Sequence, residues 1–237
     1  MFYWLLKYVF IGPLFRLLFR PQVEGLENVP DDGPVILCPN HLSFIDSLLV
    51  PLILPRKVVF LGKSDYFGKW YSWFFTGVGV IPVNREGGER SEAALIAGVE
   101  QLSRGRVVAI YPEGTRSPDG RLYRGKTGPA RMALRARCPI VPVAVFNTDK
   151  ALPTGKYLPR PIQIRVRYGK PLDFSRYEDK ADDRFVLRSI TDEVMYELML
   201  LTGQEYVDEY ASKFKGNVAK DAGPSSPAAR TPGTKAS

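Results

Sequence analysis

Apolar runs and segments of helical periodicity alternate through the middle of the chain. Six short runs are rich in apolar residues, many of them β-branched, and a segment of helical character follows each of the first four. The predicted strands span 34–39, 57–61, 78–83, 106–111, 140–146 and 162–168, and the predicted helices span 43–54, 66–75, 89–103 and 128–137. Strands that are apolar throughout must be buried on both faces. The alternation therefore predicts an α/β fold in which helices flank a mostly parallel central sheet.

The pattern changes towards the C-terminus. The run at 162–168 alternates between apolar and polar residues, which is typical of a half-exposed edge strand. Two further helices are predicted at 182–201 and 204–214. After Gly216 the sequence is polar and rich in Pro, Gly, Ser and Ala, so we expect it to be disordered. The expected organisation is a helix over 1–20, a globular domain over 21–215 and a disordered tail over 216–237.

The first nineteen residues are almost wholly apolar and aromatic. A helix of that length is about 30 Å long, enough to span a bilayer core. Lys7 and Arg16 interrupt the segment and Pro13 lies inside it, which favours an amphipathic helix at the membrane surface. The aromatic residues expected near lipid headgroups are Tyr3, Trp4 and Tyr8, and the cations expected to reach lipid phosphates are Lys7, Arg16 and Arg20. A second aromatic cluster at 66–75 is either another membrane contact or a helix packed on the core.

Charge and cysteine content narrow the class of partner. The net charge is +8 and the isoelectric point is about 9.4, which favours an anionic partner such as nucleic acid, a phospholipid surface or a phosphorylated substrate. The sequence contains no signature of an RNA-binding domain, helix-turn-helix or zinc finger, so nucleic acid is disfavoured. Cys38 and Cys138 lie in apolar runs and are expected to be buried thiols. No Cys/His cluster is present, so no metal site is expected.

Polar residues follow each of the first four predicted strands. His41 and Asp46 follow the first, Lys63 the second, Arg85 the third and the segment 111–117 the fourth. Ligands of parallel α/β sheets bind outside the carboxyl ends of the strands, so these residues are expected to meet at one site.

His41 is the only histidine of the chain, and histidine exchanges protons near neutral pH. Asp46 could orient its imidazole and stabilise the imidazolium, as carboxylates do in hydrolytic triads. A structural interpretation is also open, because Ser43-x-x-Asp46 matches a capping box that begins a helix. The two interpretations are compatible, since a helix start that positions Asp46 could also aim His41.

The turn Glu113-Gly114-Thr115-Arg116 has the features of an anion-binding site. Its arginine could bind a phosphate through two hydrogen bonds, and its glycine allows close approach of a ligand. Arg85 and Lys126 could complete the pocket, although a single cation is more often a solvated surface charge. Glu113 could instead pair with an arginine. No Gly-x-Ser-x-Gly motif is present, so a covalent acyl-enzyme is disfavoured and the His–Asp pair needs a hydroxyl from the substrate.

Four motifs in this order resemble those of the 1-acyl-sn-glycerol-3-phosphate acyltransferase (lysophosphatidic acid acyltransferase) family. They are Asn40-His41-x4-Asp46, the stretch from Gly79 to Arg85, the Tyr-Pro-Glu-Gly-Thr-Arg-Ser segment at 111–117, and Ile140-Val141-Pro142-Val143. The resemblance covers about residues 22–170. It implies that 21–215 is a glycerolipid acyltransferase domain that converts lysophosphatidate into phosphatidate in phospholipid biosynthesis.

The resemblance also implies roles for the site residues. His41 would act as the general base on the free hydroxyl of the acceptor, and Asp46 would hold the imidazole. The hydroxyl oxygen would then attack the thioester of acyl-CoA or acyl-carrier protein, with no cofactor or metal. The residues expected to bind the acceptor's phosphate are Arg85, Glu113, Gly114, Thr115 and Arg116, with Lys126 and Lys63 as weaker candidates.

Alternatives remain for the acceptor and for the class of protein. The same fold could acylate glycerol 3-phosphate, another lysophospholipid or a glycolipid alcohol. A non-catalytic protein that binds anionic lipid would also explain the charge and the N-terminal helix. We expect attachment to the cytoplasmic face of the cell membrane through 1–20, with a possible contribution from 66–75.

Overall fold

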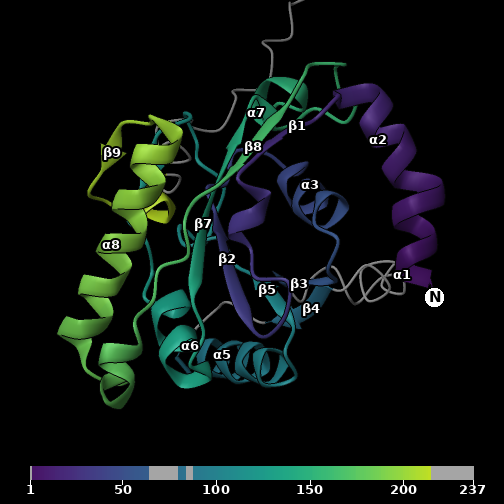
Figure 1. Ribbon diagram of the computed structural model, residues 1–237. Helices are drawn as coiled ribbons and strands as arrows, with labels where there is room; N and C mark the ends of the chain where they lie inside the picture. Colours follow the sequence, from purple (N-terminus) through teal and green to yellow (C-terminus); the bar gives the residue numbers. More distant parts are fainter. Residues whose placement is uncertain (1, 64–79, 84–87, 215–237) are drawn as a thin grey trace, which may run out of the picture.

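A seven-stranded sheet forms the centre of the protein (Figure 1). The computed structural model describes residues 2–63, 80–83 and 88–214. The strands lie in the order β1-β8-β7-β2-β5-β3-β4. Their bounds are β1 Gln22–Glu24, β2 Val35–Pro39, β3 Val58–Lys63, β4 Val80–Val83, β5 Val107–Ala109, β7 Ile140–Phe146 and β8 Arg165–Tyr168. Strands β2, β3, β4, β5 and β7 are parallel and β8 is antiparallel to β7, so the predicted mostly parallel sheet is confirmed.

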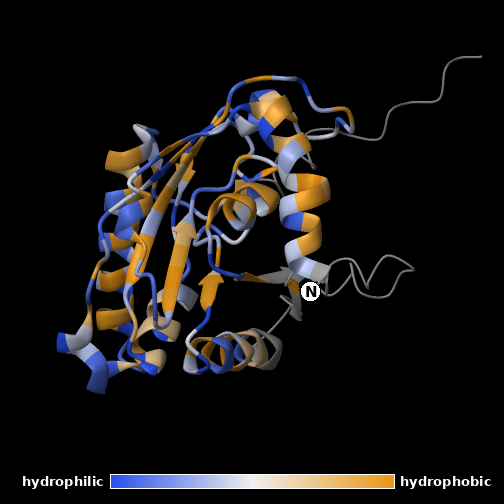
Figure 2. Cartoon of the chain, turned by 45° about the vertical axis from the view of Figure 1, so that its right-hand side comes forward, coloured by the Kyte–Doolittle hydropathy of each residue, from blue (hydrophilic) through white to orange (hydrophobic). Residues whose placement is uncertain are grey.

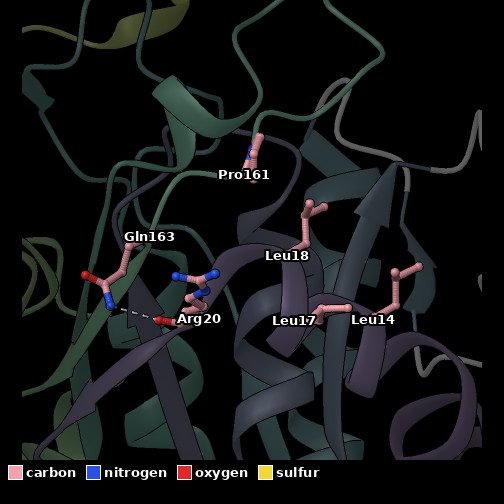
Figure 3. Close-up of a pocket in the computed structure, with 6 residues that line it drawn as sticks. All are labelled: Leu14, Leu17, Leu18, Arg20, Pro161 and Gln163. Carbon is pink, nitrogen blue, oxygen red and sulfur yellow. Dashed lines mark hydrogen bonds between the residues drawn. The ribbon is translucent and has the colours of Figure 1, made fainter.

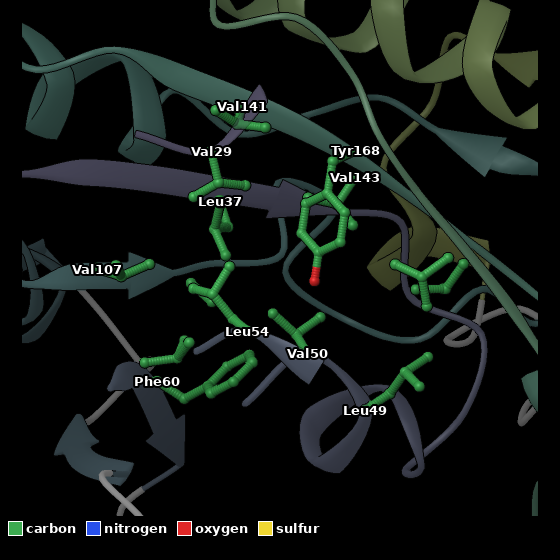
Figure 4. Close-up of a cluster of buried hydrophobic side chains, with 14 of the residues drawn as sticks. Val29, Leu37, Leu49, Val50, Leu54, Phe60, Val107, Val141, Val143 and Tyr168 are labelled. Atoms are coloured by element: carbon green, nitrogen blue, oxygen red, sulfur yellow. The ribbon is translucent and has the colours of Figure 1, made fainter. Parts of the chain in front are cut away.

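Helices cover both faces of the sheet. The N-terminal helix and α3 (Asp46–Ile53) pack on one face, and α5 (Gly88–Ser103), α6 (Gly128–Ala136) and α8 (Arg184–Thr202) pack on the other. In β2, Leu37 belongs to the first core and Ile36 to the second, and neither has any exposed surface. Figure 4 shows the first core, where Leu37 lies near Leu54 at the end of α3. Burial on both faces explains why apolar residues fill this strand.

The remaining short elements connect these layers. They are η2 (Leu26–Asn28), β6 (Leu122–Tyr123), α7 (Thr148–Ala151), η4 (Ser175–Lys180) and β9 (Tyr206–Val207). Cys38 and Cys138 are buried free thiols, as predicted. The predicted helix at 66–75 and the predicted disordered tail at 216–237 lie outside the described residues.

The prediction of an edge strand at 162–168 is wrong. β8 lies between β7 and β1, and β1 forms the edge by pairing in parallel with β8, Val23 opposite Val166. The alternation is real, because Val166 and Tyr168 are buried while Arg165 and Arg167 are half-buried. The error arises because β1 has only three residues, all exposed, and therefore carries no apolar pattern.

The predicted helix at 204–214 is wrong in its first part. Gly203 adopts a positive φ of 68° and ends α8, after which β9 pairs with β6 in a separate two-stranded sheet. Helical structure begins again only at residue 211. Glycine in the left-handed region is a common helix terminator, so the chain leaves α8 extended.

The N-terminal segment is a continuous helix with a π-helical turn in its middle: α1 (Phe2–Leu5), η1 (Leu6–Phe10) and α2 (Ile11–Phe19). Two expectations for it are wrong. Lys7 does not reach outward; it is 4% exposed and its amine donates to the carbonyl of Leu54. Tyr3 is also buried, with its hydroxyl 3.4 Å from the carbonyl of Pro51. Both side chains lie on the face of the helix that packs on the domain.

The other residues expected to face lipid are accessible. Trp4 and Tyr8 are exposed, as are Arg16 and Arg20. Burial, with a smaller contribution from Arg16, lowers the pKa of Lys7 to about 8. Among the described residues, no helix combines the length and apolar character needed to cross a bilayer.

Candidate active site

Two adjacent strands deliver the main elements of the site. β2 and β5 pair in parallel, with Leu37 opposite Ala109, so the segments that follow them emerge side by side. The backbone N–H of Ser117 donates to the carbonyl of His41 at 2.7 Å, which joins the two segments directly. The structure therefore brings His41 and the 111–117 turn to one edge of the sheet.

His41 and Asp46 form the predicted pair. Nδ1 of His41 lies 2.9 Å from Oδ2 of Asp46, and Asp46 has no exposed surface. The same oxygen accepts hydrogen bonds from the backbone N–H groups of Leu42 at 2.7 Å and Ser43 at 2.8 Å. These donors fix the carboxylate, and the carboxylate in turn fixes the imidazole. Since Nδ1 faces Asp46, Nε2 is the ring nitrogen that can act as a base.

The capping-box interpretation is half confirmed. The Asp46 carboxylate accepts from the backbone N–H of Ser43 at the start of α3, as a capping box requires. The hydroxyl of Ser43 instead donates to the carbonyl of Leu152 at 2.8 Å. Oδ2 of Asp46 thus accepts backbone hydrogen bonds at the start of α3 and also orients the imidazole of His41.

Tyr111 belongs to the predicted 111–117 segment, although no role of its own was predicted for it. Its ring stacks on the imidazole of His41, with 3.7 Å between the ring centroids and 11° between the planes. Its hydroxyl lies 3.1 Å from Oγ of Ser47, on α3. Tyr111 is 8% exposed and forms a wall beside the imidazole. The signal was available, because Tyr111 directly precedes Pro112-Glu113 at the carboxyl end of a predicted strand.

Glu113 positions backbone. It is 1% exposed, and its Oε1 accepts from the N–H of His41 at 3.2 Å while Oε2 accepts from the N–H of Tyr123 at 3.0 Å. One carboxylate therefore connects the His41 segment to β6. These two hydrogen bonds give Glu113 a positioning role. The phosphate contact that the resemblance implies for Glu113 stays a prediction.

Two cations lie at the turn after Glu113: Arg116 within it and Lys126 beside it. Gly114 has a φ of 72°, and a Cβ there would lie 3.0 Å from Cε of Lys126, so the lysine side chain lies against the turn. The backbone N–H of Lys126 donates to the carbonyl of Pro112 at 2.8 Å. Lys126 is exposed and Arg116 half-buried, and neither forms an ion pair with any described residue. Both cations can therefore serve an anionic ligand.

The remaining predicted residues are placed less completely. Thr115 is half-buried in the same turn. Lys63 is the last residue of β3, at the same end of the parallel strands, but its side chain is outside the description. Arg85 lies outside the described residues. In the described part of the chain, no group of three or more His, Cys, Asp or Glu residues could hold a metal ion.

Comparison with known proteins places this geometry in context. Residues 20–146 match the family model described as Acyltransferase. The chain is 33% identical over 167 residues to the chloroplastic 1-acyl-sn-glycerol-3-phosphate acyltransferase BAT2 of Brassica napus, covering 69% of this chain and 47% of the relative. It is 29% identical over 165 residues to the 1-acyl-sn-glycerol-3-phosphate acyltransferase of Bacillus subtilis, covering 67% and 78% of the two chains.

A solved structure agrees with these matches. The crystal structure of the 1-acyl-sn-glycerophosphate acyltransferase PlsC from Thermotoga maritima is similar with a TM-score of 0.61 and 25% sequence identity, covering 78% of this chain and 74% of that one. The chain spans about half the length of the curated plant relatives it matches.

Proposed function

Because the chain belongs to the 1-acyl-sn-glycerol-3-phosphate acyltransferase family, we propose that it transfers a fatty acyl group from a thioester donor to the free hydroxyl of lysophosphatidate. The product is phosphatidate. The observation that carries the proposal is the His41–Asp46 pair, whose Nδ1 and Oδ2 atoms lie 2.9 Å apart at the sheet edge where the 111–117 segment adds Arg116. The donor is acyl-CoA or acyl-carrier protein.

The reaction needs one base that later acts as an acid. Nε2 of His41 takes the proton of the acceptor hydroxyl while that oxygen attacks the thioester carbonyl carbon. The tetrahedral intermediate collapses, the carbon–sulfur bond breaks, and the imidazolium returns the proton to the departing thiolate. Asp46 stabilises the imidazolium between these steps. General base catalysis of this kind contributes about 10²- to 10⁴-fold to a rate.

The acceptor's phosphate is the second element of the proposal. Arg116 can bind it through two parallel hydrogen bonds, and Lys126 adds a mobile positive charge over Gly114. We include Arg85 as a third cation on its motif position alone. Binding the phosphate here holds the hydroxyl within reach of His41, which is the positioning that transfer requires.

Membrane attachment is the third element. The outer face of the N-terminal helix leaves Phe10, Leu14 and Leu17 more than half exposed. Figure 2 shows the hydrophobic colouring along this helix. An exposed apolar face next to Arg16 and Arg20 is suited to lie in the interface of an anionic leaflet. Acyl thioesters and reduced thiols both belong to the cytoplasm, so we propose the cytoplasmic face of the cell membrane.

The decisive experiment assays untagged protein, because a histidine tag would add imidazoles to a chain that has one. Thiol release is followed with acyl-CoA or acyl-carrier protein as donor and four acceptors: lysophosphatidate, glycerol 3-phosphate, another lysophospholipid and a glycolipid alcohol. We expect the highest kcat/KM with lysophosphatidate and loss of turnover in His41→Ala. Equal turnover by His41→Ala would refute the mechanism, and a preference for another acceptor would refute the assigned substrate. No turnover with any acceptor would leave the lipid-binding alternative.

A further inference from the structure

A loop with an apolar tip projects from the domain between α7 and β8. Its base is closed by a hydrogen bond of 2.7 Å from the N–H of Arg160 to the carbonyl of Ala151. The tip carries Tyr157, 98% exposed, and Leu158, 84% exposed. Two neighbouring large apolar side chains at the end of a closed loop are costly to hydrate, which marks a contact surface rather than a spacer.

This loop adjoins the N-terminal helix. The N–H of Ile164 donates to the carbonyl of Phe19 at 3.1 Å, and Nε2 of Gln163 donates to the carbonyl of Arg20 at 3.4 Å. A pocket of about 460 Å³ lies between the two elements. Figure 3 shows its lining, which is Leu14, Leu17, Leu18, Arg20, Pro161 and Gln163. The exposed face of α2 and the loop therefore form one continuous surface.

Positive charges flank the apolar tip. Lys150, Lys156 and Arg160 are exposed on the loop and its base, and none forms an ion pair with another described residue. Cations beside exposed apolar side chains match an anionic phospholipid surface, where the apolar groups enter the interface and the cations meet phosphates. This combination favours a bilayer over a water-filled interface with a protein.

The loop is also connected to the catalytic segment. Its first residue, Leu152, accepts a hydrogen bond from the hydroxyl of Ser43, two residues after His41. Contact of the tip with lipid would therefore fix the height of His41 above the membrane surface.

We propose that residues 152–161 form a second membrane-contacting element, which inserts Tyr157 and Leu158 into an anionic phospholipid surface beside α2. The inference rests on the proposed membrane attachment of the N-terminal helix. It adds a contact from the catalytic domain, so that the protein is held at two points.

The native cysteines make a site-specific test possible. Cys38 and Cys138 are buried, so a thiol-reactive, environment-sensitive dye labels an introduced surface cysteine selectively. The dye is placed at Leu158→Cys and, as a matched control, at Phe185→Cys on α8, where the native side chain is 87% exposed. The helix α8, which contains the control position, lies across the sheet from α2 (Figure 1). Vesicles contain either equal parts of phosphatidylglycerol and phosphatidylcholine or phosphatidylcholine alone.

We expect the dye at 158 to report an apolar environment on anionic vesicles and the dye at 185 to remain in water. Sedimentation of the same samples measures binding. Protein that sediments with vesicles while the dye at 158 stays in water would overturn the loop inference and leave the attachment of the N-terminal helix intact. Protein that binds no vesicle overturns both. A response at 158 to acyl-carrier protein alone would assign the loop to a protein partner and overturn the inference.

Substitutions give a second measurement. Tyr157→Ser combined with Leu158→Ser is expected to weaken vesicle binding about tenfold to a hundredfold, from the apolar area withdrawn from lipid. Lys156→Gln combined with Arg160→Gln is expected to weaken binding about tenfold on anionic vesicles only. Phe185→Ser should change nothing. Turnover of a short-chain, water-soluble donor and acceptor should be unchanged in all variants, which verifies that they fold; unchanged vesicle binding in both double variants would overturn the inference.

Discussion

Asp46→Asn separates the charge of the orienting carboxylate from its geometry. Oδ2 of Asp46 accepts from Nδ1 of His41 and from the backbone N–H groups of Leu42 and Ser43. Oδ1 is buried and has no hydrogen-bond partner among the described residues. In the variant, the two backbone donors require the amide oxygen to take the Oδ2 position. The imidazole therefore keeps its orientation and its proton on Nδ1, and only the negative charge is lost.

The size of the effect follows from the separation of the charges. With 2.9 Å between Nδ1 and Oδ2, the centres of the imidazolium and the carboxylate are about 4 Å apart. At an effective dielectric constant of about 20 their attraction is about 4 kcal/mol. The imidazolium forms only as the hydroxyl is deprotonated, so the loss appears in kcat rather than KM. We expect kcat to fall by about 10²- to 10³-fold.

The assay measures kcat and KM from thiol release with acyl-CoA and lysophosphatidate, and thermal unfolding confirms that the variant folds. Asp179→Asn is the matched control, because it removes the same charge from an exposed position on η4. A kcat within about threefold of wild type would refute the assigned role of Asp46. A rise in KM at constant kcat would show that Asp46 contributes to substrate binding rather than to catalysis.

Three further predictions test neighbouring contacts. Glu113→Gln must turn an NH₂ group towards one of two backbone N–H donors, so the free energy of unfolding should fall by about 1–3 kcal/mol in urea denaturation; no change would contradict the two-acceptor geometry. Tyr111→Leu removes a ring contact worth about 0.5–1.5 kcal/mol, so kcat should fall by up to about tenfold and Tyr111→Phe should restore most of it; equal losses in both would assign the effect to the hydroxyl. Lys7 has its pKa lowered from 10.5 to about 8, and the unfolded chain therefore binds a proton that the folded chain lacks between these values. The free energy of unfolding should rise as the pH increases from about 8 to about 10.5, and Lys7→Met should remove that part of the rise.

The sheet and the active-site segments could be predicted because their signals are local. Strands buried on both faces read as uninterrupted apolar runs, and the five-residue step from His41 to Asp46 is set by one turn and the start of α3. The order of the strands in the sheet was not needed to predict that these residues meet at one site. Every parallel strand delivers its following segment to the same edge, so convergence of the polar residues follows from direction alone.

Composition alone could not predict which face of the N-terminal helix is buried. A segment that is apolar on all sides does not reveal which side meets lipid and which meets protein. The inner side includes Tyr3, Lys7, Phe15 and Phe19, which are separated by four or eight residues. That periodicity was visible in the sequence, but Lys7 on this face predicts that the face is exposed to solvent. Its burial depends on the carbonyl of Leu54 and on aromatic rings around the amine, which only tertiary structure provides.

Backbone partners were the other information that the sequence lacked. The pattern at 113–116 indicates charged groups near a ligand, but it does not reveal which backbone groups Glu113 contacts. The phosphate contact that the family resemblance implies for Glu113 stays a prediction. The structure pairs that carboxylate with the backbone N–H groups of His41 and Tyr123. Every residue except proline carries such a group, so no motif encodes the pairing. The same limit applies to β1 and β9, whose pairings depend on backbone hydrogen bonds rather than on apolar side chains.

Several backbone groups help to hold the segment that carries His41. Its N–H donates to Glu113, its carbonyl accepts from Ser117, and the next two N–H groups donate to Asp46. The buried carboxylates of Glu113 and Asp46 thus fix the backbone around His41, and Asp46 also holds its imidazole ring. The imidazole is therefore already ordered in the folded protein, and no further conformational entropy is lost to order it in the transition state. Loss of any of these contacts should therefore lower kcat more than it raises KM, even though several of the residues never reach the substrate.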